Sequence, residues 1–101
     1  MPPSQQLSTL SFDECEWDEN KRRINLAKHK IDFEDAAALF DAPALVIDSG
    51  HKSESRFLAI GCVSKRLITV VFTMRGARCR IISARRAREN EQRAYHQAQA
   101  Q

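Results

Sequence analysis

The feature that most constrains the fold is a pair of apolar, β-branched segments separated by only two residues. Residues 56–63 (RFLAIGCV) and 66–74 (RLITVVFTM) are rich in the residue types that favour strands. Two strands joined through Ser64 and Lys65 predict a β-hairpin. An antiparallel sheet is therefore the expected centre of the fold.

Further strands are expected on both sides of this hairpin. Residues 44–49 (ALVIDS) precede it, and residues 78–84 (RCRIISA) follow a turn at Arg75-Gly76. Together they predict an antiparallel meander sheet of about four strands. Residues 11–17 (SFDECEW) alternate loosely and are a candidate first strand.

Two helices are expected before the sheet. Asp18 can cap a helix over residues 19–30, and Asp32 can cap a second one that stops before Asp41, because Pro43 disfavours helix at Ala42. The first helix divides into two expected faces. Its apolar face holds Ile24, Ala27 and Ile31, and the neighbouring polar arc holds Lys21, Asn25, Lys28 and His29.

A third helix is expected from Arg85 to about Gln97, with Ala87, Ala94 and Tyr95 as its packing residues. Helices and strands are thus segregated along the chain, which predicts an α+β fold with helices on one side of the sheet. The length of 101 residues predicts a single domain. We expect it to span residues 11–97, between a disordered leader (1–10) and a frayed tail (98–101).

Charge is distributed unevenly. Residues 1–50 carry five Lys or Arg against ten Asp or Glu, a net −5, and residues 51–101 carry eleven against three, a net +8. Such asymmetry is typical of proteins with a polyanionic partner such as nucleic acid. A solvated surface with local ion pairs would explain it equally well.

Arginine is concentrated in the segment RCRIISARRAR, residues 78–88, which contains five of them. Strict alternation would put Arg78, Arg80, Ile82 and Ala84 on one face, and Cys79, Ile81, Ser83 and Arg85 on the other. Guanidinium groups bind phosphate oxygens bidentately. Basic residues also protect edge strands from aggregation, so both explanations stay open.

Other kinds of site are poorly supported. Cys15, Cys62 and Cys79 are odd in number and far apart, which argues against a disulfide framework and favours a reducing cytoplasm. Neither His51 nor His96 has metal-ligand spacing to a cysteine or carboxylate, so no metal site is expected. No apolar run is long enough to span a membrane.

His29 has two possible roles. Histidine titrates close to neutral pH and can transfer protons as a general acid or base. A histidine in the last turn of a helix can equally cap the terminal carbonyl groups.

Several separated motifs, in order, resemble the BrnT family of bacterial toxins from about Cys15 to His96. They are Glu16-Trp17-Asp18, Lys21, Asn25, Lys28-His29, Phe33-Glu34, Glu54-x-Arg56-Phe57, Arg75-Gly76 and Arg80-Ile81-Ile82-Ser83-Ala84-Arg85. Two positions depart from the family pattern. Lys30 stands where glycine is usual after the helix, and Arg86 stands where lysine is common.

This resemblance implies a RelE-like fold and an endoribonuclease that arrests growth by cutting RNA without a metal or other cofactor, using the substrate's own 2′-hydroxyl. It also implies a cognate ribbon-helix-helix (BrnA-like) antitoxin, with two toxins per antitoxin dimer and DNA contacted only through the antitoxin. The alternative is a non-catalytic partner that binds the antitoxin and acts in operon repression.

Site residues follow from the resemblance and the basic pattern together. The expected catalytic or phosphate-stabilising residues are His29, Arg56, Arg80 and Arg85. The expected RNA-binding residues are Trp17, Lys21, Lys28, Arg75 and Arg78. Trp17 could stack on a base, although a lone tryptophan beside a helix start is more often part of the core. Glu54 is expected to pair with an arginine, and Tyr95 to anchor the last helix.

Overall fold

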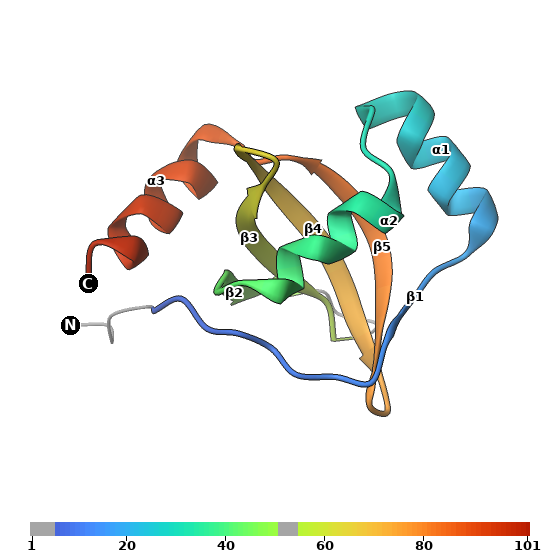
Figure 1. The fold of residues 1–101 in the computed structure, drawn as a ribbon, viewed down its shortest axis with the longest axis horizontal. Helices are drawn as coiled ribbons and strands as arrows, with labels where there is room; N and C mark the ends of the chain where they lie inside the picture. Colours follow the sequence, from blue (N-terminus) through green and yellow to red (C-terminus); the bar gives the residue numbers. More distant parts are fainter. Residues whose placement is uncertain (1–5, 51–54) are drawn as a thin grey trace.

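The computed structural model describes residues 6–50 and 55–101. Its elements, in chain order, are β1 (Cys15–Glu16), α1 (Glu19–His29), α2 (Phe33–Ala36), the 3₁₀ helix η1 (Ala37–Asp41), β2 (Leu45–Asp48), β3 (Phe57–Val63), β4 (Arg66–Arg75), β5 (Arg78–Arg86) and α3 (Glu89–Gln99). The strands form a five-stranded sheet in the order β1-β5-β4-β3-β2 (Figure 1). The α+β class is confirmed.

The sheet is mixed rather than a simple meander. Strands β2 to β5 pair antiparallel as expected, but β1 lies parallel to β5, with Cys15 opposite Cys79 and Glu16 opposite Arg80. The expected first strand, 11–17, shortens to two residues. The chain runs beside the β4–β5 turn before β1, where the Asp13 amide donates to the Ala77 carbonyl at 2.8 Å.

Helices cover both faces of the sheet, which corrects the expectation that they lie on one side. On the front face of Figure 1, α2 and η1 pack Phe33, Leu39 and Phe40 onto β3, β4 and β5. Gly61 allows this close approach, because a Cβ atom there would lie 2.9 Å from the Leu39 Cγ. On the rear face, Tyr95 of α3 joins a second core cluster.

The second cluster contains Leu45, Ile60, Ala87, Tyr95 and Ala98. Tyr95 is buried, which confirms its expected packing role. The last helix begins later than expected, since β5 continues through Arg86 and α3 starts only at Glu89.

Parts of the expected leader make contacts with the domain. Leu7 packs against the rear cluster, and Ser8 forms an isolated bridge with Ala44 through two backbone hydrogen bonds of 2.8 and 2.9 Å. Leu10 and Phe12 pack against the front cluster. Residues 6–10 thus run along the domain, and residues 1–5 lie outside the described part of the chain.

The two N-terminal helices are capped as expected. Asp18 accepts from the Asn20 amide at 2.9 Å, and Asp32 accepts from the Glu34 amide at 3.0 Å. Asp32 also receives two hydrogen bonds from Arg22, at 2.8 and 2.9 Å, which joins the start of α2 to the side of α1. The Arg22 guanidinium lowers the pKa of the Asp32 carboxyl.

Candidate functional site

A β-bulge in β5 decides which of its side chains share a face. The register shifts where Val71 is paired with Ser83 but Phe72 is paired with Ile81, so Ile82 is an extra residue. Paired residues in an antiparallel ladder point to the same face.

Strict alternation therefore gives the wrong grouping for β5. Arg80, Ser83 and Arg85 are paired with Thr73, Val71 and Thr69, which alternate regularly along β4. All three therefore lie on the rear face. Cys79, Ile81 and Ala84 lie together on the front face, where they are buried.

Helix α1 turns its polar arc toward β5, contrary to expectation. Ile24 on the expected apolar face is 58% exposed, whereas Asn25 is only 5% exposed. The Asn25 amide donates to the Ala84 carbonyl at 2.9 Å, and its oxygen accepts from the Ala84 amide at 3.1 Å. Asn25 thus satisfies the edge of β5 beyond the point where β1 ends, and a third bond to the Ile31 carbonyl fixes its own position.

This contact leaves a hollow of about 190 Å³ between α1 and β5, which we call the α1–β5 groove. Its lining residues are Lys21, Ile24, Asn25, Lys28, His29, Ile82 and Ser83. Three sequence-predicted site residues, Lys21, Lys28 and His29, therefore come together. Ser83 was not singled out as a site residue, since the bulge that puts it here has no signature in the sequence.

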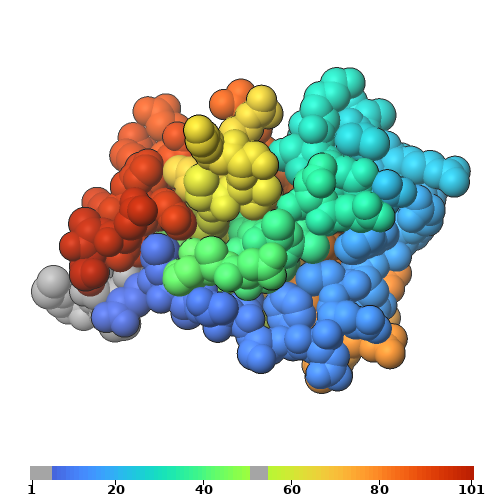
Figure 2. Space-filling model, viewed as in Figure 1, coloured from blue at the N-terminus to red at the C-terminus, as the bar shows by residue number. Residues whose placement is uncertain are grey.

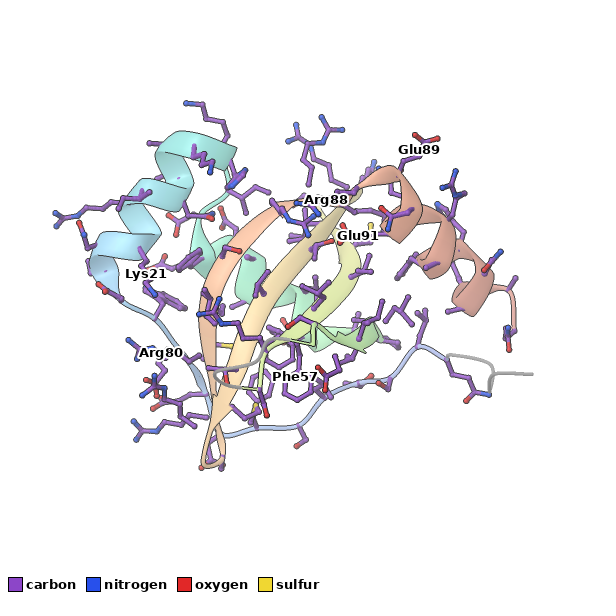
Figure 3. The ribbon with its side chains drawn as sticks, turned by 180° about the vertical axis from the view of Figure 1, so that it is seen from behind. Lys21, Phe57, Arg80, Arg88, Glu89 and Glu91 are labelled. Atoms are coloured by element: carbon purple, nitrogen blue, oxygen red, sulfur yellow. The ribbon has the colours of Figure 1, made fainter. Side chains whose placement is uncertain are left out.

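Arg80 lies on the same face as Ser83, near the N-terminal end of β5. Its guanidinium donates to the Glu16 carboxylate at 2.8 Å, and both side chains are about one-third exposed. Figure 3 shows Arg80 on the side of the sheet toward which Lys21 also points. A single ion pair that water still reaches contributes little, ~0–1 kcal/mol, so a phosphate can compete with Glu16 for Arg80.

Arg85 is held much more firmly. Its two terminal nitrogens donate to Glu91 at 2.8 and 2.9 Å, in a pair whose side chains are only 16% and 7% exposed. Glu91 also accepts from the Thr69 hydroxyl at 2.9 Å and the Arg88 amide at 2.8 Å. The Arg85 guanidinium, with these other donors, lowers the pKa of Glu91 to about 2.

Glu91 was not identified from the sequence. A glutamate three residues after a helix cap is a recognisable signal only when the cap is Ser, Thr, Asp or Asn. Here the cap position is Arg88, so the pattern is hidden. Figure 3 shows Arg88 and Glu91 close together where β5 leads into α3.

The remaining predicted site residues lie outside the α1–β5 groove. Trp17 is half-buried and packs edge-to-face on Phe33, with 6.1 Å between ring centroids. Arg78 lies 3.4 Å from Glu14, opposite the exposed Arg75. Arg56 immediately precedes β3 and is partly buried. His51 and Glu54 fall outside the described residues.

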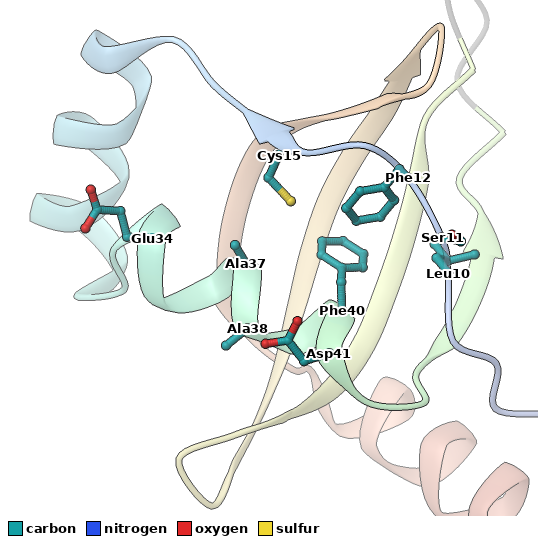
Figure 4. Close-up of a pocket in the computed structure, with 9 residues that line it drawn as sticks. All are labelled: Leu10, Ser11, Phe12, Cys15, Glu34, Ala37, Ala38, Phe40 and Asp41. Carbon is teal, nitrogen blue, oxygen red and sulfur yellow. The ribbon is translucent and has the colours of Figure 1, made fainter.

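A larger hollow of about 480 Å³ lies on the front face, under the N-terminal segment (Figure 4). Its polar lining includes the carboxylates of Glu34 and Asp41. Negative charge there disfavours phosphate, so size alone does not make this hollow the RNA-binding site.

Two further classes of site were looked for in residues 6–50 and 55–101. There, no group of three or more His, Cys, Asp or Glu side chains is placed to hold a metal ion. None of the helices found in the same residues is long and apolar enough to cross a membrane.

Comparison with known proteins assigns the family. Residues 17–91 match the family described as "Ribonuclease toxin, BrnT, of type II toxin-antitoxin system". The crystal structure of the Brucella abortus ribonuclease toxin BrnT matches with a TM-score of 0.63 and 35% identity, covering 75% of this chain and 97% of that chain. No curated protein sequence matches. The chain belongs to the BrnT family of ribonuclease toxins of type II toxin–antitoxin systems.

Proposed function

We propose that the chain cuts RNA in the α1–β5 groove by attack of the substrate 2′-hydroxyl on the adjacent phosphorus, without a metal ion. The observation that carries this proposal is the inward turn of the polar arc of α1. It brings Lys21, Lys28 and His29 together beside Ser83 in one hollow. No carboxylate is among the residues found to line this hollow, so its field favours a phosphate.

The groove residues divide the chemistry between them. His29 transfers a proton, either from the attacking 2′-hydroxyl or to the leaving oxygen. Lys21 and Lys28 hold the phosphate and stabilise the charge that develops on it. Arg80 contacts the phosphate from the same face of the sheet once RNA displaces Glu16.

Arg85 has a different role in this proposal. Both of its terminal nitrogens are occupied by a buried carboxylate, so a phosphate contact would require breaking that pair. We assign it as a positioning residue that fixes the end of β5 against α3. Trp17, Arg56, Arg75 and Arg78 are proposed as outer RNA contacts on either side of the groove.

The family implies an antitoxin partner, and we propose its form. It is a ribbon-helix-helix dimer that binds two copies of this chain, and DNA is contacted only through it. The antitoxin inhibits by covering the cationic rear face, so it competes with RNA. Both proteins act in the cytoplasm, where the RNA substrate is found.

Cleavage of a labelled single-stranded RNA by the purified protein tests the proposed function. We expect activity in excess chelator, and a loss of about 10²–10⁴-fold in His29→Ala, the usual contribution of a general acid or base. Arg93→Ala is the matched control, since Arg93 is an exposed cation of α3 outside the groove. Metal-dependent cleavage, or full activity of folded His29→Ala, would contradict the mechanism.

A further inference from the structure

A second cationic hollow lies at the end of the sheet where the β3–β4 turn meets α3. It has a volume of about 420 Å³ and its lining includes Lys65, Arg66, Arg86 and His96. We call it the end groove. The turn that carries Lys65 is exposed between α3 and α1 in Figure 2. None of these four residues belongs to the α1–β5 groove.

The lysine and arginines of the end groove have no partner carboxylate in the described part of the chain, unlike five of the other arginines of this protein. Arginines 22, 78, 80, 85 and 93 each lie in an ion pair with a carboxylate. Lys65, Arg66 and Arg86 form no ion pair with any described carboxylate, and no acidic residue is among those found to line the groove. Three positive charges around one hollow therefore remain available to a ligand.

Backbone conformation at the turn gives an independent observation. Ser64 and Lys65 have φ of 51° and 66°, the left-handed region, and together form the whole loop between β3 and β4. Such two-residue turns favour Asn-Gly. A non-glycine residue in this conformation costs roughly 1–2 kcal/mol. Lysine at the second position adds strain that glycine would avoid, which fits a role for its ammonium group.

We propose that the end groove binds backbone phosphates of the same RNA strand that enters the α1–β5 groove. Ser83 of one groove and Arg86 of the other are three residues apart on β5, so their backbone positions are roughly 10 Å apart along the strand. That distance corresponds to about three stacked nucleotides at ~3.4 Å each. Phosphate contacts position a strand without reading its sequence. The end groove therefore adds affinity for RNA and orients the strand relative to the α1–β5 groove.

The test compares two triple variants. Lys65→Asn, Arg66→Gln and Arg86→Gln together remove the charge of the end groove, and asparagine tolerates the left-handed turn. Arg23→Gln, Lys30→Asn and Arg93→Gln remove three exposed cations elsewhere. Lys30 is a close match for Lys65, since it too has a left-handed φ, of 62°.

The probe is a labelled, fully 2′-O-methylated single strand, which cannot be cut by the proposed chemistry. About 12 nucleotides at ~3.4 Å each span the 41 Å long axis of the molecule. Losing three phosphate contacts should make the negative slope of log K against log salt shallower by about 2. At ~0.1 M salt this corresponds to a loss of roughly 100-fold in affinity. The control variant should bind within a few-fold of the unmodified protein.

This inference rests on the proposed function in taking RNA as the ligand and the α1–β5 groove as its other binding site, and the two can fail separately. Unchanged affinity and salt slope in the end-groove variant would overturn it, even if the protein cuts RNA. It would also be overturned if the variant bound RNA normally but lost affinity for the antitoxin. An equal loss in both triple variants would overturn it too. Loss confined to the end-groove variant supports it, even if the protein proves unable to cleave.

Discussion

The Asn25 side chain makes the hydrogen bonds to β5 that a neighbouring strand would otherwise make. Strand β1 pairs with β5 only as far as Arg80, so the outer edge of β5 at Ala84 would otherwise carry an unpaired amide and carbonyl. The Asn25 side chain carries an N–H donor and a carbonyl acceptor in the same plane and satisfies both groups of Ala84, while its second N–H bonds to the Ile31 carbonyl. This geometry brings α1 against β5 and so creates the groove beside them.

Asn25→Ala should therefore lower the free energy of unfolding by about 3 kcal/mol, taking ~1–3 for each backbone group left without a partner. Urea unfolding followed by circular dichroism measures the change. Asn20→Ala in the same helix is the control, because Asn20 is exposed. Equal, small effects in both variants would mean that water replaces the Asn25 bonds.

Because of Glu91, the free energy of unfolding should fall as the pH is lowered through the acid range. Its folded-state pKa of about 2 lies below its ordinary value of 4.5, so its contribution is complete above pH 4.5 and is lost as pH falls toward 2. The difference corresponds to about 3 kcal/mol, at ~1.36 kcal/mol per pH unit. Unfolding curves at several pH values should show a steeper fall for the unmodified protein than for Glu91→Gln. Parallel falls in the two proteins would contradict this assignment.

Among the elements, those defined by local signals could be predicted from the sequence. The Ser64-Lys65 hairpin and the caps at Asp18 and Asp32 depend on neighbouring residues alone, and the structure confirms them. The stop that Pro43 imposes at Ala42 is also found, although η1 continues one residue further than expected, through Asp41. The continuous second helix was not confirmed, since it splits into α2 and η1. The helical segment is short, and 3₁₀ geometry is common at the ends of short helices, so the change from α2 to η1 costs little free energy.

Features that depend on tertiary pairing could not be predicted. The bulge at Ile82 is visible only when β5 is set against β4, yet it decides that Arg80 and Arg85 share a face. Likewise, Ile24 and Ala27 indicate an apolar face for α1, but the unpaired edge of β5 selects the face with Asn25. A buried backbone edge without partners costs more than one exposed isoleucine. The groove residues were thus identified individually, whereas their common location required the structure.

Helix α1 ends in a strained position. Lys30 has a φ of 62°, and its amide closes the helix by bonding to the Leu26 carbonyl at 3.0 Å. Lys30→Gly should raise the free energy of unfolding by about 1 kcal/mol, since glycine enters the left-handed region without a steric cost. Thermal and urea unfolding check this. Lys28→Gly is the counterpart inside the helix and should lower stability by about 1 kcal/mol, so two changes of the same sign would argue against a cap effect.

In the whole molecule, the two faces of the sheet have different roles. The front face is closed by α2, η1 and the N-terminal segment and holds most of the apolar core (Figure 1). The rear face is covered by α3 only toward β2 and β3, and on β5 it carries Ser83 and Arg80, the latter labelled below α1 in Figure 3. Stability thus depends mainly on one face, which leaves the other available for cationic side chains.

The antitoxin should bind this rear face and exclude RNA from it. We expect two copies of this chain and one dimer of the antitoxin encoded by the adjacent gene to elute as one species, with the corresponding mass by light scattering. RNA cleavage should fall in proportion to complex formed, because the same cations cannot face a carboxylate and a phosphate at once. Added salt should slow association, since opposite charges steer the encounter.

Arg80→Gln should weaken both antitoxin and RNA binding, whereas Arg93→Gln on α3 should affect neither. A stable complex that cuts RNA at the free rate would show that the antitoxin binds elsewhere, most plainly if Arg80→Gln left its affinity unchanged.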